Sequence, residues 1–176
     1  ACELSSRNAN YANPLMRYTI PYRQIGIANE LIKSIPETTT NATLKAERAQ
    51  ALAVRAFDYM SLAPYFQFSY ATDSLPPCIP VLTDGADATN NPRATVKDVY
   101  ESVMSDLNAA INGLAGYTRT SKDQIDQNVA YGLRARANLA MCHYAAAAAD
   151  ADKAMQGYTP ASRNEVSTPS FYDLTD

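Results

Sequence analysis

Aromatic side chains gather between positions 65 and 70, in the segment YFQFSY, and Asp73 and the proline-rich stretch LPPCIP follow closely. A tyrosine ring offers a flat apolar face and a polar tip, which suits the C–H faces and hydroxyl rims of sugars. We therefore predict that Tyr65, Phe68, Tyr70 and Asp73 bind carbohydrate. The alternative is burial, the commoner fate of Phe, and it is expected for Phe66. Tyr70 is expected to face a ligand, whereas Tyr65 and Phe68 fit either role.

Aromatic contacts of this kind hold sugars weakly. Each contributes roughly 0.5–1.5 kcal/mol beyond area burial, so three of them with a few hydrogen bonds correspond to Kd values of about 10 μM to 1 mM. Such a site captures a glycan and releases it again.

The sequence contains no residues at spacings typical of a catalytic or metal-binding site. The one histidine, His143, lies at a predicted turn with no nucleophile motif around it. Acidic pairs near the last two predicted helices have the spacing of a solvated helix face. These pairs are Asp123 with Asp126, and Asp150 with Asp152. The acidic segment 84–91 lacks the register of a calcium-binding EF-hand and is expected to be a polar turn. We predict no enzyme activity, no cofactor and no metal.

An alanine-rich segment precedes the aromatic cluster and has the period of an amphipathic helix. Its apolar residues recur at steps of three and four: Ala49, Leu52, Ala53, Ala56, Phe57, Met60 and Ala63. Small residues let a second helix approach closely, while the large ones fill the space between. We predict a helix at about residues 44–66. Arg55 on it, and Arg134 further on, are expected to form structural ion pairs with Asp58 or Asp106.

A second apolar stripe runs from residue 95 to residue 114. Thr95 and Asp98 have capping-box spacing at its start, and Gly113 and Gly116 end it. We predict that this helix pairs with the one at 44–66 in a hairpin. The segment 67–94 between them is far longer than a hairpin turn needs, and such insertions are usually functional or disordered.

The segment from Asn138 resembles the second half of a tetratricopeptide repeat. Tyr144, Ala147, Lys153 and Ala154 lie where that repeat places its tyrosine, its packing alanine and its closing Lys-Ala pair. We predict a second hairpin that pairs residues 127–142 with 144–157.

Ahead of both hairpins, apolar residues again step by three and four along Ile25, Ala28, Ile32 and Ile35. Proline is favoured in the first turn of a helix and cannot continue one. Pro21 is therefore expected to start this helix, and Pro36 to end it.

Composition fits one globular helical domain over residues 1–176. A hydrophobic fraction of 47% and a formal charge of −3 are ordinary values, and there is no basic excess to favour nucleic acid. The apolar runs are shorter than the roughly 20 residues of a membrane span. Cys78 and Cys142 are expected to be buried as free thiols, and a disulfide between them in an oxidising compartment is the alternative. Cys2 is not expected to be a lipid anchor.

Five blocks in order resemble the SusD/RagB family, the surface glycan-binding lipoproteins of Bacteroidetes. They span residues 22–35, 49–66, 79–100, 106–111 and 130–154. The resemblance implies an all-α fold of tetratricopeptide-like helical hairpins in a right-handed α–α superhelix, with the loop insertion 67–94 in the first hairpin. It also implies that the chain is a fragment, because the family continues into a second, more variable half.

The same resemblance implies the biological setting. Members sit as a lid on a SusC-like TonB-dependent transporter in the outer membrane and carry a lipid anchor, which would lie outside this fragment. Capture of oligosaccharides at the cell surface is the function expected. The alternative is a helical-repeat adaptor that binds a protein or peptide. The interrupted first hairpin favours glycan capture, because a peptide groove needs consecutive regular repeats.

Overall fold

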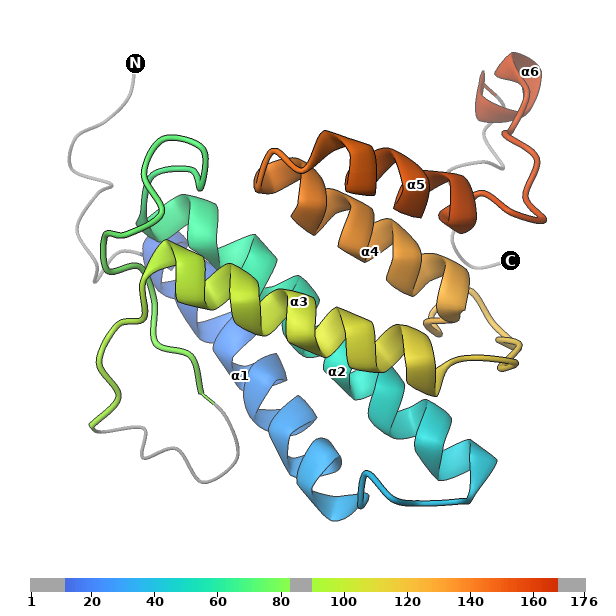
Figure 1. Cartoon of the computed structure of the whole chain (residues 1–176), viewed down its shortest axis with the longest axis horizontal. Coiled ribbons are helices and arrows are strands. Elements are labelled where there is room, and N and C mark those ends of the chain that lie inside the picture. Colours follow the sequence, from blue (N-terminus) through green and yellow to red (C-terminus); the bar gives the residue numbers. More distant parts are fainter. Residues whose placement is uncertain (1–11, 83–89, 168–176) are drawn as a thin grey trace.

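The computed structural model describes residues 12–82 and 90–167 of the chain (Figure 1). Those residues form helices and no strand, apart from one isolated bridge between Pro77 and Thr95. The helices are α1 (Ala12–Ser34), α2 (Ala42–Phe66), α3 (Val96–Gly113), α4 (Gln127–Ala140), α5 (Tyr144–Ala154) and the short α6 (Arg163–Ser167). The prediction of an all-α, tetratricopeptide-like fold is confirmed.

The helices pack as two hairpins with one further helix beside them. α2 packs along α3 and α4 packs along α5, as predicted, and α1 packs along α2. Figure 1 shows α1, α2 and α3 side by side, with the α4–α5 hairpin stacked against α3. The insertion leaves from one end of α2 and returns at the start of α3, so it lies at one end of the bundle.

Alanine and glycine set how closely α2 and α3 approach each other. A Cβ atom added to Gly113, the last residue of α3, would stand 2.6 Å from the Cβ of Ala49 on α2. Real Cβ atoms do not come that close, so glycine is required by this contact. The sequence pattern assigned Gly113 only a role in ending the helix.

Both helices of the first hairpin, α2 and α3, begin at side-chain caps. The Asn41 side chain accepts hydrogen bonds from the backbone N–H groups of Thr43 and Leu44, at 3.0 and 3.2 Å. At α3, Thr95 and Asp98 form the predicted capping box, each accepting from the other's backbone N–H. These bonds satisfy donors that the first helical turn leaves unpaired.

The predicted start of the first helix is wrong, because α1 begins at Ala12 and contains Pro21 in its interior. Proline removes one helical hydrogen bond, and packing around it offsets that cost. The ring centroids of Tyr18 and Tyr22 lie 4.5 Å apart on either side of Pro21. Tyr18 also packs edge-on against Phe66 at the end of α2, with the ring centroids 5.4 Å apart.

Two arginines form ion pairs inside the hairpins, as expected for a structural role. Arg55 on α2 donates two hydrogen bonds to Asp106 on α3, at 2.8 and 2.7 Å. Arg134 on α4 donates two to Asp150 on α5, at 2.8 and 2.6 Å. Asp58, the other candidate partner, does not take part in either pair, and the predicted partners are wrong for Arg134, which binds Asp150 instead.

The expectation of solvated acidic pairs is wrong for two of the four residues. Asp150 is only 4% exposed, and hydrogen bonds from Arg134 and Asn138 compensate for its burial. Asp126 is 9% exposed and caps α4 by accepting from the backbone N–H of Val129. Buried carboxylates need such partners. His143 lies at the start of α5, at the predicted turn.

The two described cysteines are free and differ in burial. Cys78 is buried, as expected, and its thiol lies 3.7 Å from the carbonyl oxygen of Ala63. Cys142 is exposed, so the prediction of burial is wrong there, and the two do not form a disulfide. Cys2 and most of the acidic segment 84–91 lie outside the described residues. None of the described helices is both long and apolar enough to cross a membrane.

Candidate carbohydrate-binding surface

The insertion is held to the start of α3 by backbone hydrogen bonds. Cys78 N–H donates to the carbonyl of Ala94 at 2.7 Å, and Ala94 N–H donates to that of Ile79 at 2.9 Å. Val96 and Lys97 donate in the same way to carbonyls at positions 76 and 74. The buried side chains of Cys78 and Ile79 belong to the main core. This part of the insertion is therefore a fixed extension of the bundle.

Three helical side chains hold the segment 80–82 against α1 and α2. The Tyr59 hydroxyl donates to the Leu82 carbonyl at 2.9 Å and accepts from the Leu82 N–H at 2.8 Å. The Asn29 amide donates to the same carbonyl at 3.0 Å. The Tyr22 hydroxyl donates to the Pro80 carbonyl at 2.6 Å. A backbone segment without regular structure thus has its polar groups satisfied.

The same side chains connect the insertion to the ion pair inside the first hairpin. The Asn29 oxygen accepts from Arg55 at 2.7 Å, and Arg55 also binds Asp106. A chain of hydrogen bonds therefore runs from α3 through α2 and α1 to Leu82. Burial raises the pKa of Tyr59 to about 12, so its hydroxyl keeps its proton and stays a donor at neutral pH.

Tyr65 lies at the surface, in the last turn of α2, with 60% of its area exposed. The guanidinium of Arg17 on α1 stands 4.4 Å from the centroid of the Tyr65 ring. The ring lines a hollow of about 350 Å³ between α1 and α2, together with apolar Met16 and Ile20 and the hydroxyl-bearing Ser61. An aromatic ring, a cation and a hydroxyl beside one hollow are groups that can contact a bound sugar.

Phe68 is also exposed, with 69% of its area accessible just beyond the end of α2. Its position is fixed through Gln67, whose side-chain oxygen accepts from the Phe68 N–H at 2.9 Å. The Gln67 amide in turn donates to the Pro77 carbonyl at 2.9 Å. The ring is therefore presented on a braced turn, and Leu75 in the same loop is 70% exposed.

Tyr70 and Asp73 have surroundings of a different kind. The Tyr70 ring is partly buried and packs edge-on against Tyr100 of α3, with the ring centroids 5.6 Å apart. Asp73 is exposed, and its carboxylate accepts from the backbone N–H of Leu75 at 3.0 Å, which closes a turn. Phe66 is partly buried against the core. The structure thus leaves the rings of Tyr65 and Phe68 largely exposed and packs that of Tyr70. Sugar contact by all four residues stays a prediction.

Sequence reasoning did not identify the residues that hold the insertion in place. Asn29 and Tyr59 appeared only as members of blocks typical of a family, and Tyr22 only as the start of one. One signal was present, since Asn29 and Tyr59 are polar-tipped side chains beside buried positions of amphipathic helices. Their partners, however, are 53 and 23 residues away along the chain.

A stacked helical frame with a braced loop and exposed rings at one end defines a helical-repeat binding scaffold. The chain belongs to the SusD-like family described as "Starch-binding associating with outer membrane", which it matches over residues 3–139. No curated protein matches the chain.

Solved structures of the same superfamily share the fold. A SusD-like carbohydrate binding protein from Bacteroides vulgatus superposes with a TM-score of 0.78 at 27% identity, over 86% of this chain and 33% of its own. A SusD superfamily protein from Bacteroides thetaiotaomicron gives 0.74 at 28% identity, over 82% and 33%. A laminarin binding SusD-like protein gives 0.65 at 20% identity, over 84% and 31%, a likeness of fold alone. The chain spans about a third of the length of these relatives.

Proposed function

We propose that the protein captures oligosaccharides at the outer surface of the outer membrane and performs no chemistry on them. The observation that carries this proposal is the exposure of Tyr65 and Phe68, at 60% and 69%, beside a loop that hydrogen bonds hold in place. Exposed rings at the end of a helix and on the braced turn that follows it give contact area with little loss of conformational entropy on binding. Family membership supports the same reading.

The proposal extends to the setting of the protein. As a surface lipoprotein anchored through a lipid outside these residues, it would deliver glycan to a SusC-like TonB-dependent transporter. Sugar contacts at Tyr65 and Phe68, with Asp73 and Tyr70 nearby in the sequence, would be weak enough for release. Kd values of about 10 μM to 1 mM follow from a few aromatic contacts.

The test measures glycan affinity in the full-length gene product and in two variants, Tyr65→Ala and Phe68→Ala. Loss of one ring contact worth roughly 0.5–1.5 kcal/mol raises Kd by about 2- to 12-fold. The matched control is Tyr144→Ala, because Tyr144 is 64% exposed on α5, away from the insertion. Equal affinity in all four proteins would remove Tyr65 and Phe68 from the site. Tyr70→Ala is a poorer variant, since it also removes packing against Tyr100.

A further inference from the structure

Two sets of side chains repeat the same hydrogen-bond pattern along the chain. In the first, Arg55 on α2 binds Asp106 on α3 with two hydrogen bonds, and its third nitrogen donates to Asn29 on α1 at 2.7 Å. In the second, Arg134 on α4 binds Asp150 on α5 with two, and its third donates to Asn108 on α3 at 2.6 Å. The asparagine precedes the arginine by 26 residues in both sets.

The repeated pattern relates the helices to each other. α1 corresponds to α3, α2 to α4, and α3 to α5, so the second set is the first set moved along the chain by one repeat. In the later set, the groove between α3 and α4 is filled by α2. Apolar residues on both sides of that groove are fully buried by this contact: Val103, Leu107, Ala110 and Ala130, each 0% exposed.

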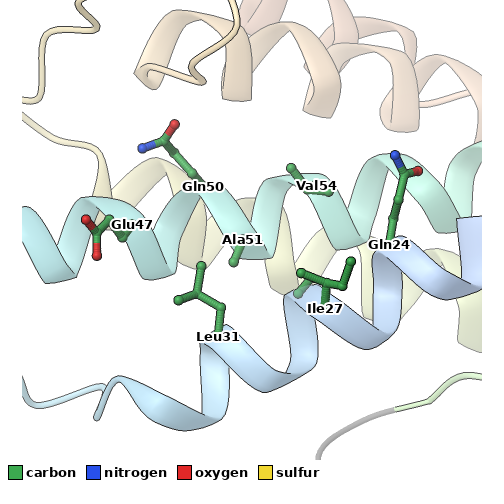
Figure 2. A pocket seen from close by; sticks show the side chains of 8 residues that line it. Gln24, Ile27, Leu31, Glu47, Gln50, Ala51 and Val54 are labelled. Carbon is green, nitrogen blue, oxygen red and sulfur yellow. The ribbon is translucent and has the colours of Figure 1, made fainter.

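The matching groove between α1 and α2 is not covered by any described part of the chain. It holds a hollow of about 340 Å³, and Figure 2 shows side chains of both helices around it. Ile27 on α1 is 71% exposed and Leu31 is 38% exposed, opposite Ala51 and Val54 on α2. Large exposed apolar groups gathered along one groove mark an interaction surface.

The correspondence between the two sets indicates which residues a helix in the α1–α2 groove would contact. Because Asn29 corresponds to Asn108, Ile27 takes the place of Asp106, which binds Arg55 of α2. A helix in the α1–α2 groove therefore meets an isoleucine there and needs no arginine. By analogy with α2, it would run antiparallel to α1 and bury small apolar residues, as Ala49, Ala53 and Ala56 do.

We propose that this groove seats one further amphipathic helix, supplied by sequence of the same polypeptide beyond these 176 residues. The solved relatives are about three times as long as the part that this chain matches, which leaves ample chain to supply it. The added helix would pack against α1 and α2 as α2 packs against α3 and α4. Repeat arrays need such a terminal cover. The proposal does not depend on glycan binding.

The test compares thiol labelling at two positions of the full-length gene product. Ile27→Cys places a thiol in the groove, and Glu30→Cys places one on the exposed side of α1, each in a background with Cys2→Ser and Cys142→Ser. In the present structure both positions are exposed, and Cys78 is buried. A maleimide reagent should react with the thiol of Ile27→Cys at least roughly tenfold more slowly than with that of Glu30→Cys, and equally fast in urea.

Three results would overturn the proposal. The first is equal labelling at the two positions in the folded protein. The second is protection of the Ile27→Cys thiol that disappears when the protein is diluted, which would make a second copy the occupant. The third is a gene product with no chain beyond these residues. If either variant fails to fold, protection of the groove is measured on wild-type protein, by hydroxyl-radical footprinting of Ile27 against Leu139, which is 58% exposed on α4.

Discussion

At the residue scale, Asp58 is a buried acidic group whose burial is not fully compensated by hydrogen bonds. It lies on α2 with 2% of its surface exposed, and its Oδ2 atom has no hydrogen-bond partner among the described residues. Burial raises the pKa of its carboxyl from 3.8 to about 7. Removing a charge from water without a partner costs free energy, so the folded state favours the protonated acid.

The raised pKa of Asp58 makes stability depend on pH. Between about pH 4 and about pH 7 the folded state keeps a proton that the unfolded chain has released, so the free energy of unfolding falls as pH rises. Asp58→Asn cannot ionise and should lack this fall. As pH rises from 5 to 8, we expect the free energy of unfolding of the variant to increase by about 1–3 kcal/mol relative to that of wild type, measured by urea unfolding. Parallel pH profiles of the two proteins would show that Asp58 is not responsible.

At the element scale, the contact of α2 with α3 depends on a glycine. Gly113→Ala would place its Cβ 2.6 Å from that of Ala49, and overpacking of this kind costs roughly 1–3 kcal/mol. Gly26→Ala is the matched control, because nothing lies within 4 Å of its added Cβ in the middle of α1. There the better helix propensity of alanine should stabilise by about 0.5–1 kcal/mol. Thermal unfolding distinguishes the two, and stabilisation by both substitutions would contradict the close approach.

The anchoring of the insertion is a second property of elements. Tyr59→Phe keeps the buried ring and removes both hydrogen bonds to Leu82, each worth roughly 0.5–1.5 kcal/mol. We expect amide exchange at Leu82 to become about tenfold faster or more, with little change at Val103 in the core of α3. Unchanged exchange at Leu82 would mean that Asn29 and the backbone pairs hold the segment without Tyr59.

Periodicity predicted most elements, because their buried faces are continuous along the chain. The pairing of α2 with α3 follows from the apolar faces of the two segments, with small and large residues alternating on α2. The pairing of α4 with α5 follows from the tetratricopeptide-like spacing of residues in α5. The start of α1 could not be predicted in the same way, since Pro21 lies inside the helix and Tyr18, one turn before it, packs against distant Phe66. Local pattern carries no information on such contacts.

The candidate site was only partly predictable, for a related physical reason. Whether an aromatic ring is exposed depends on what the fold places beside it. Tyr70 packs on Tyr100 and Tyr65 faces Arg17, and both partners lie far away in the sequence. The anchors Asn29 and Tyr59 could not be assigned, because their acceptors are backbone groups, which carry no signature in the sequence.

At the scale of the whole molecule, the chain is a right-handed stack of helical hairpins with one insertion. The repeated Asn–Arg–Asp pattern fixes the stack, and the insertion is tied to it through Asn29. A rigid frame of this kind limits what binding must order, which would lower the entropic cost of the proposed capture on exposed rings. Glycan capture by the complete protein is the central proposal.

The most direct test of that proposal is native affinity electrophoresis of the full-length gene product through gels that contain single polysaccharides. Starch and laminarin come first, because the family description and one solved relative name them. We expect retarded migration in at least one gel, with Kd of about 10 μM to 1 mM and weaker retardation for Tyr65→Ala and Phe68→Ala. Unchanged mobility in every gel of a broad panel of plant, algal and host glycans would contradict glycan capture.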